Sequence, residues 1–126
     1  MKYVTLALTF LFGAFMIFGG VNHFRTPAMY EPFFADSLPK TALIYASGVL
    51  EIVIGLLVFI PQYRHWGTLG ILALMLAFFP LHLFDVFSDT PAVGSHQAAI
   101  YRLIMQFVLI GWAWYIHRAN SSVSMK

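Results

Sequence analysis

The sequence contains no cysteine. Disulfides, thiolate metal sites and CxxC redox chemistry are therefore excluded for this chain. Charged residues are also scarce, at 10% of 126 residues, whereas a soluble domain carries about a quarter. Hydrophobic residues make up 60% of the chain, and the mean hydropathy is +0.80. The polar surface that a water-soluble globule needs is missing, so the composition predicts a protein whose solvent is largely lipid.

A basic stripe is absent as well. The net charge of +2 comes from a few scattered lysines and arginines. Such a pattern gives no support to nucleic-acid binding. We therefore expect the lipid bilayer, and no nucleic acid, as the main partner of the chain.

Four apolar segments run along the chain, at about residues 3–21, 38–60, 66–84 and 96–116. Each approaches the ~20 residues that a helix needs to cross ~30 Å of hydrocarbon. A helix satisfies its own backbone in lipid, and the strict alternation of a membrane β-barrel is absent. The sequence predicts an all-α fold, a single transmembrane four-helix bundle over residues 1–126 with a long outer loop between helices 1 and 2.

Serines and prolines mark the predicted helix ends. Ser37 and Ser95 are expected to cap the second and fourth helices, with Pro39 in the first turn of the second and Pro61 ending it. Lys2 and the apolar stretch after it also match the first two regions of a signal peptide. The stretch is long and ends in a poor cleavage site, so we expect it to remain as the first helix.

The loops predict an orientation. With four spans, both termini and the connection at 62–65 share one side, which carries lysines and arginines but no acidic residue. The acidic residues Glu31, Asp36 and Asp89 fall on the opposite side. The positive-inside rule then places both termini in the cytoplasm, with the chain integral to the bacterial cytoplasmic (inner) membrane.

Few polar side chains remain in or beside the spans, and we expect all of them in the outer half of the bundle. Glu51 interrupts the apolar run ASGVLEIVIGL (46–56) near the bilayer midplane. We expect His65 and His117 in water or lipid head groups at the inner interface. The candidate polar core or ligand-binding residues are Asn22, His23, Glu51, His82, Asp85, Arg102 and Gln106.

Glu51 needs a partner, because a lone carboxylate at the midplane costs about 3 kcal/mol on insertion scales. Arg102 is the expected partner, since it stays charged and offers five donors. Gly48 and Gly55 share the Glu51 face and are expected to let helices 2 and 4 approach closely around the pair. The pair, with Gln106, can fix helix register only, or form part of a binding or proton-handling site. The sequence leaves both interpretations open.

A metal site is a further interpretation of the same residues. His23 and His82, with Asp85 and Glu51, have the ligand types of a two-histidine, two-carboxylate site. No HxxH or ExxH pair occurs on one helix. We therefore assign no metal ligand and no catalytic residue, and expect His23 and His82 to form hydrogen bonds at the mouth of the bundle.

The first outer connection, residues 22–39, is longer than a helix hairpin requires. Its prolines divide it into short pieces, and its aromatic residues make it amphipathic. We expect it either to lie flat at the membrane interface or to fold back as a lid over the outer half. The sequence does not distinguish the two.

The order of several motifs resembles the DoxX-like family of small four-helix integral membrane proteins. The motifs are NHF (22–24), SGVLEIVIG (47–55), FFPLHL (78–83) and YRLIMQ (101–106), and the resemblance covers essentially the whole chain. That family includes a subunit of a thiosulfate:quinone oxidoreductase and proteins linked to redox modules, while distant relatives assist receptor assembly. The resemblance therefore implies a fold more firmly than a reaction.

Three classes of function remain open. The favoured one is binding of a lipophilic small molecule, a quinone or a lipid, by a redox-associated accessory protein. A partner would then transfer the electrons, because the sequence has no haem-attachment or flavin motif. The alternative is a non-catalytic assembly or chaperone subunit for another membrane protein, with the Glu51–Arg102 pair purely structural. Movement of a proton or small solute ranks third. Catalytic activity stays open, and so does association with a membrane protein or a second copy.

Overall fold

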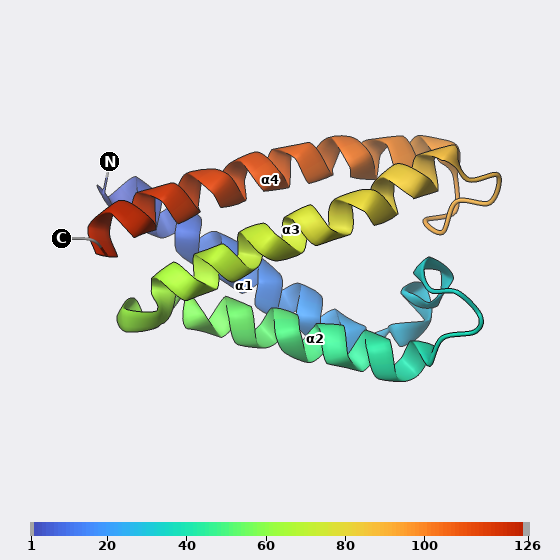
Figure 1. Cartoon of the computed structure of the whole chain (residues 1–126), viewed down its shortest axis with the longest axis horizontal. Helices are drawn as coiled ribbons and strands as arrows, with labels where there is room; N and C mark the ends of the chain where they lie inside the picture. Colours follow the sequence, from blue (N-terminus) through green and yellow to red (C-terminus); the bar gives the residue numbers. More distant parts are fainter. Residues whose placement is uncertain (1, 125–126) are drawn as a thin grey trace.

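The computed structural model describes residues 2–124, and the side chains of residues 2–122, as a bundle of four long helices (Figure 1). The long helices are α1 (Lys2–Arg25), α2 (Lys40–Leu57), α3 (Arg64–Phe87) and α4 (His96–Ser124). Short 3₁₀ helices lie in two connections: η1 (Pro27–Met29), η2 (Glu31–Phe33) and η3 (Pro61–Tyr63). All four long helices are long and apolar enough to cross a membrane. The predicted all-α membrane bundle is confirmed.

The helix ends agree with the sequence in part. Ser95 caps α4, because its hydroxyl accepts a hydrogen bond from Ala98 N at 3.1 Å. Ser37 does not cap α2, which is a correction. Pro39 itself occupies the cap position with φ −75°, and its carbonyl accepts the first helical bond from Leu43 N at 3.1 Å. The ring of Pro39 already presets the helical φ angle at that position.

The four helices form two antiparallel hairpins, α1–α2 and α3–α4, which lie side by side (Figure 1). We call the end that holds both termini and η3 the terminal end. The opposite end, which holds the connections 26–39 and 88–95, is the loop end. Contacts within each hairpin are far more extensive than contacts between the hairpins. In Figure 1 the hairpins lie close together near the terminal end and separate toward the loop end.

Two glycine pairs set the distance between α1 and α2. A Cβ atom on Gly48 would lie 2.9 Å from the carbonyl oxygen of Gly20, and one on Gly55 would lie 2.7 Å from that of Gly13. In each helix the two glycines are seven residues, or two turns, apart and therefore share a face. The predicted close approach at Gly48 and Gly55 does occur, but against α1 instead of α4.

The apolar core lies in the terminal half, where all four helices meet. It comprises Phe12, Met16, Ile54, Val58, Ile71, Leu72, Met75, Ala113 and Ile116. These residues bind the two hairpins together on the side of the terminal end. The loop half has no equivalent continuous core among the described residues.

Polar contacts reinforce the terminal half, contrary to the expectation that it has none. Thr9 accepts a hydrogen bond from Asn120 at 3.0 Å, which joins α1 to α4. Thr68 lies 3.2 Å from His117 Nδ1 and Ser121 lies 3.0 Å from His65 Nδ1, which joins α3 to α4. His65 and His117 were expected in water or head groups. They meet because α3 begins at Arg64 and α4 extends to Ser124, beyond the predicted helix ends.

Candidate functional site

Glu51 pairs with His23. The Oε2 atom of Glu51 lies 2.7 Å from the Nε2 atom of His23, and these residues are 8% and 7% exposed. The expected pairing of Glu51 with Arg102 is therefore wrong. The glycine contacts explain the choice, because the close approach of α1 and α2 carries the Cβ atom of His23 to Gly48, one turn from Glu51.

Hydrogen bonding indicates that Nδ1, the other ring nitrogen of His23, carries a proton. Its Nδ1 atom lies 2.9 Å from the carbonyl oxygen of Ile44, which can only accept, so Nδ1 donates and carries a proton. Ser47 Oγ donates to the same carbonyl at 2.9 Å and lies 3.1 Å from Nδ1. One further proton lies between Nε2 and the carboxylate. Whether His23 or Glu51 holds that proton, the pair has no net charge.

The pair leaves one carboxylate oxygen of Glu51 available. Oε2 is buried and pairs with Nε2 of His23 at 2.7 Å. Oε1 lies beside Gly19, a residue of α1, since a Cβ atom there would be 3.8 Å from it. Oε1 can therefore accept a hydrogen bond from a molecule beside it.

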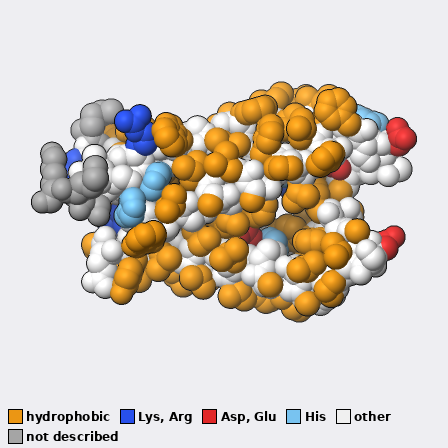
Figure 2. Space-filling view, in the orientation of Figure 1, with side chains coloured by type: hydrophobic (Ala, Val, Ile, Leu, Met, Phe, Trp, Pro, Cys, Tyr) orange, Lys and Arg blue, Asp and Glu red, His pale blue; other side chains and the backbone are white. Residues whose placement is uncertain are grey.

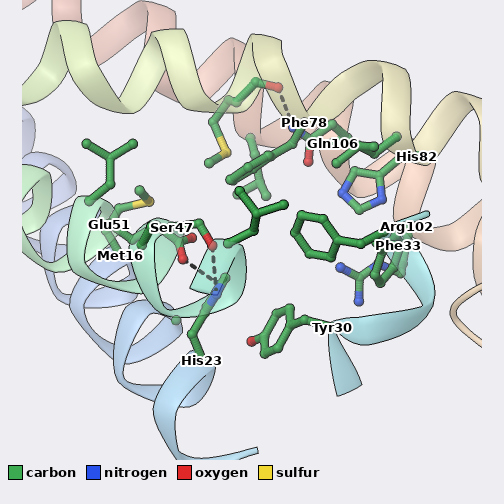
Figure 3. A pocket seen from close by; sticks show the side chains of 18 of the residues that line it. Met16, His23, Tyr30, Phe33, Ser47, Glu51, Phe78, His82, Arg102 and Gln106 are labelled. Carbon is green, nitrogen blue, oxygen red and sulfur yellow. Dashed lines mark hydrogen bonds and ion pairs between the residues drawn. The ribbon is translucent and has the colours of Figure 1, made fainter. Parts of the chain in front are cut away.

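A cavity of about 550 Å³ adjoins the pair in the loop half of the bundle (Figure 3). Its volume falls within the range of small-molecule sites. All four helices and the 26–39 connection contribute to it. The lining residues are Phe15, Met16, Gly19, His23, Tyr30, Phe33, Phe34, Leu43, Ala46, Ser47, Leu50, Glu51, Met75, Phe78, Leu81, His82, Arg102, Gln106 and Leu109.

Helices α3 and α4 also contribute polar side chains to the cavity lining. His82 has a buried Nδ1 atom without a hydrogen-bond partner among the described residues. Gln106 donates its side-chain amide to the carbonyl oxygen of Met75, which joins α4 to α3. Figure 3 shows His82 and Arg102 at one end of the cavity and the His23–Glu51 pair at the other.

Arg102 has no acidic partner. Among the described residues it forms neither an ion pair nor a hydrogen bond, and its guanidinium carbon lies 5.8 Å from the centre of the Phe33 ring. The cavity therefore contains a neutral pair on one wall and an uncompensated cation on the other.

The 26–39 connection folds back over the loop end of the cavity, as in the lid interpretation. The ring of Tyr30 stacks on His23, with centroids 4.0 Å apart, and the ring of Phe33 meets His82 edge-on at 6.3 Å. Burial, and then the carboxylate of Glu51, raise the pKa of the Tyr30 hydroxyl. Tyr30 is thus a neutral hydrogen-bonding group at physiological pH.

Two predicted site residues lie outside the cavity. Asp85 accepts hydrogen bonds from the backbone of Ala92 and Val93 and so orders the 88–95 connection. The backbone carbonyl of Asn22 accepts from Thr26 N at 2.9 Å, and its side chain does not line the cavity. The other five, His23, Glu51, His82, Arg102 and Gln106, all line it. Residues 2–124 include no group of three or more histidine, aspartate or glutamate side chains able to hold a metal ion.

The cavity opens sideways. Figure 2 shows a hollow between α2 and α3, with an acidic and a histidine side chain at its bottom and hydrophobic side chains around it. Glu51 is the one acidic residue of the lining. Leu43 and Leu50 of α2 and Phe78 and Leu81 of α3 belong to the cavity lining. In a membrane this opening faces hydrocarbon.

Sequence reasoning missed the aromatic and apolar lining. Tyr30, Phe33 and Phe34 could be suspected, since they belong to an amphipathic loop. Met16 and Phe78 carry no distinguishing signal, because in a membrane protein cavity-facing and lipid-facing side chains are equally apolar.

Comparison with known proteins gives a family but no function. No curated protein and no solved structure matches the chain. Residues 12–117 match the family described as "Domain of unknown function (DUF8561)". The match spans most of the chain and includes every residue of the cavity lining. The chain therefore belongs to the DUF8561 family.

Proposed function

We propose that the cavity in the loop half binds a lipophilic small molecule with a hydrogen-bonding head group, a quinone or a lipid. One observation carries the proposal: a few polar side chains line a cavity whose walls are otherwise apolar. They include the carboxylate of Glu51, the imidazole of His82 and the guanidinium of Arg102. Small-molecule sites commonly combine apolar walls with a few polar groups that orient the ligand.

The sideways opening supports a ligand that comes from the bilayer. Glu51 lies roughly 16 Å along α2 from its start at Lys40, which is about half the thickness of the hydrocarbon layer. A molecule dissolved in the bilayer can reach this depth between α2 and α3 without crossing the head groups. The apolar rim favours a lipophilic ligand along this route.

The cellular setting is part of the same proposal. The basic residues near the terminal end support a bacterial inner-membrane protein with both termini in the cytoplasm, which would place the cavity in the outer leaflet. Resemblance to the DoxX-like family supports a redox-associated accessory role. In that role a partner protein carries the electrons and this chain holds the lipophilic molecule.

A cavity-filling variant tests the proposal. In Gly19→Leu the new side chain points into the cavity, since a Cβ atom there meets only Glu51 Oε1, at 3.8 Å. Gly111→Leu is the matched control, because a Cβ atom on Gly111 meets nothing within 4 Å. Each protein is purified in mild non-ionic detergent and extracted with organic solvent, and the co-purified lipophiles are identified by mass spectrometry.

We expect a defined lipophile in stoichiometric amount with the wild type and Gly111→Leu, and its loss from Gly19→Leu. Glu51→Gln should reduce retention while the bundle stays folded. Bulk phospholipid alone, unchanged in every variant, would contradict ligand binding.

An assembly or chaperone subunit is the second candidate. The observation that favours it is the compensation of Glu51 by His23 within the α1–α2 hairpin, which a purely structural pair would also show. Crosslinking in native membranes would then trap a larger membrane protein. A chain that is trapped alone or with its own copies would count against this candidate.

A further inference from the structure

The charges around the cavity do not balance. The His23–Glu51 pair has no net charge in either of its protonation arrangements. Asp85 is held by the backbone of the 88–95 connection and does not line the cavity. Arg102, which stays ionised in proteins, lines the cavity without an ion-pair partner among residues 2–122.

We propose that the ligand of this cavity is an anionic amphiphile, with a carboxylate or phosphate head group bound by Arg102 and an alkyl chain in the apolar part of the cavity. This inference rests on the proposed function and names its ligand class. The guanidinium is suited to the task, because its planar set of donors matches carboxylate and phosphate oxygens.

Arg102 is exposed near the loop end and also lines the cavity. Arg102 lies roughly 9 Å along α4 from its start at His96. Its guanidinium lies over the ring of Phe33, a residue of the connection that covers the cavity. The guanidinium thus lies beside the 26–39 connection, where a head group can reach it from the cavity.

One polar neighbour lies at the Arg102 end of the cavity. His82 lines the cavity there, and its Nδ1 atom has no hydrogen-bond partner among the described residues (Figure 3). Tyr30 also lines the cavity, but its ring stacks on His23 at the other end. The remaining lining near the core, including Phe15, Met75 and Leu109, is apolar and suits an alkyl chain.

The inference is tested with probes of one chain length and different head groups. Palmitate and hexadecyl phosphate are the anionic probes, and hexadecanol is the neutral one. Binding of each to the full chain in non-ionic detergent is measured at pH 8 by native mass spectrometry. The variants are Arg102→Gln, Arg102→Lys and Arg118→Gln. Arg118 is the matched control, since it lies on the same helix with its guanidinium 5.7 Å from the Trp114 ring.

We expect the wild type and Arg118→Gln to prefer the anionic probes by about ten- to a hundred-fold, the ratio that hydrogen bonds to a charged group produce. Arg102→Gln should remove the preference, and Arg102→Lys should keep part of it. A stronger preference for palmitate or for hexadecyl phosphate would separate a fatty acid from a phospholipid-type head group.

Two failures are distinguishable. Equal binding of hexadecanol and the anionic probes by the wild type, abolished by Gly19→Leu, would overturn the anionic head group and leave the lipophile site intact. Anionic preference that survives in both Arg102→Gln and Gly19→Leu would place binding outside the cavity, and it would overturn this inference together with the proposed function.

Discussion

At the scale of single residues, the partner of Glu51 determines the electrostatics of the cavity. An arginine partner would neutralise Glu51 and leave the cavity without a free cation. His23 neutralises it instead, at 2.7 Å, and Arg102 remains available on the opposite wall. Because Glu51 pairs with His23, the positive charge of Arg102 remains available to the proposed anionic ligand.

The pairing predicts a specific coupling in a double-mutant cycle. His23→Leu should lower the free energy of unfolding by about 3 kcal/mol, because it leaves a buried carboxylate without its partner. The double variant with Glu51→Leu should recover at least about 1 kcal/mol of that loss. Reversible unfolding of the four proteins in mixed micelles measures the coupling.

The same method tests whether Arg102 is energetically separate from Glu51. Arg102→Gln and Glu51→Gln should be additive within about 0.5 kcal/mol, as expected for residues that do not touch. A coupling between Arg102 and Glu51 larger than that between His23 and Glu51 would contradict the His23–Glu51 pairing.

Asp36 gives a prediction for pH. The Nζ atom of Lys40 donates a hydrogen bond to its carboxylate at 2.7 Å and lowers the pKa of Asp36. A lowered pKa in the folded state means that this pair stabilises the loop above the pKa of the unfolded chain. That contribution is lost as the pH falls through the folded value.

We expect Lys40→Gln to raise the pKa of Asp36 toward its ordinary value in an NMR titration in micelles, and Lys40→Arg to raise it less. High salt should reduce the difference, since the pair is exposed. An Asp36 midpoint that is the same in Lys40→Gln and the wild type would exclude the interaction in solution.

At the scale of helices, the α1–α2 hairpin is the element that builds the site. Gly20 and Gly48 let two backbones meet, and this approach aligns His23 with Glu51. Neither helix could bury its polar residue alone, because each would expose it to lipid. The glycine contacts and the polar pair are therefore parts of one arrangement.

A methyl group at Gly48 tests this arrangement. In Gly48→Ala the added Cβ atom would lie 2.7 Å from His23 Cβ and 2.9 Å from Gly20 O, so the helices must separate. We expect a loss of about 1–3 kcal/mol, the usual cost of overpacking, together with reduced ligand retention. Gly111→Ala is the control and should be neutral or slightly stabilising, since its Cβ atom meets nothing. Equal stability of the two variants in thermal unfolding would contradict the close approach.

At the scale of the whole molecule, the bundle has two unlike halves. The terminal half holds the apolar core and the hydrogen bonds that join α4 to α1 and α3. The loop half holds the cavity, and the hairpins separate there (Figure 1). The packed core and the proposed binding site thus lie at opposite ends of the same four helices.

The absence of cysteine makes the orientation directly testable. Gln62 and Asp89 are exposed and lie at the terminal and loop ends. In intact spheroplasts, a membrane-impermeant maleimide should label Asp89→Cys and should label Gln62→Cys only after lysis. The reverse pattern would invert the proposed topology and place the cavity in the cytoplasmic leaflet.

The sequence predicts the helices better than it predicts their contacts. Length and hydropathy are sufficient for four spans, because lipid imposes them on any chain of this composition. The partner of Glu51 was missed because the first helix was expected to end at residue 21, which put His23 in a loop. α1 continues to Arg25, so His23 lies within the helix. Charge made Arg102 the obvious partner, but its true place depends on how the helices rotate against one another.

The uneven packing of the two hairpins also has a mechanical consequence. The two hairpins pack against each other at the terminal end, around Phe12 and Ile71, and separate at the loop end. A small rotation about this core would give a larger displacement at the loop end, so we expect the separation of the two hairpins there to change most easily. A ligand bound between the hairpins would restrict this motion, and its release would restore the motion at the loop end.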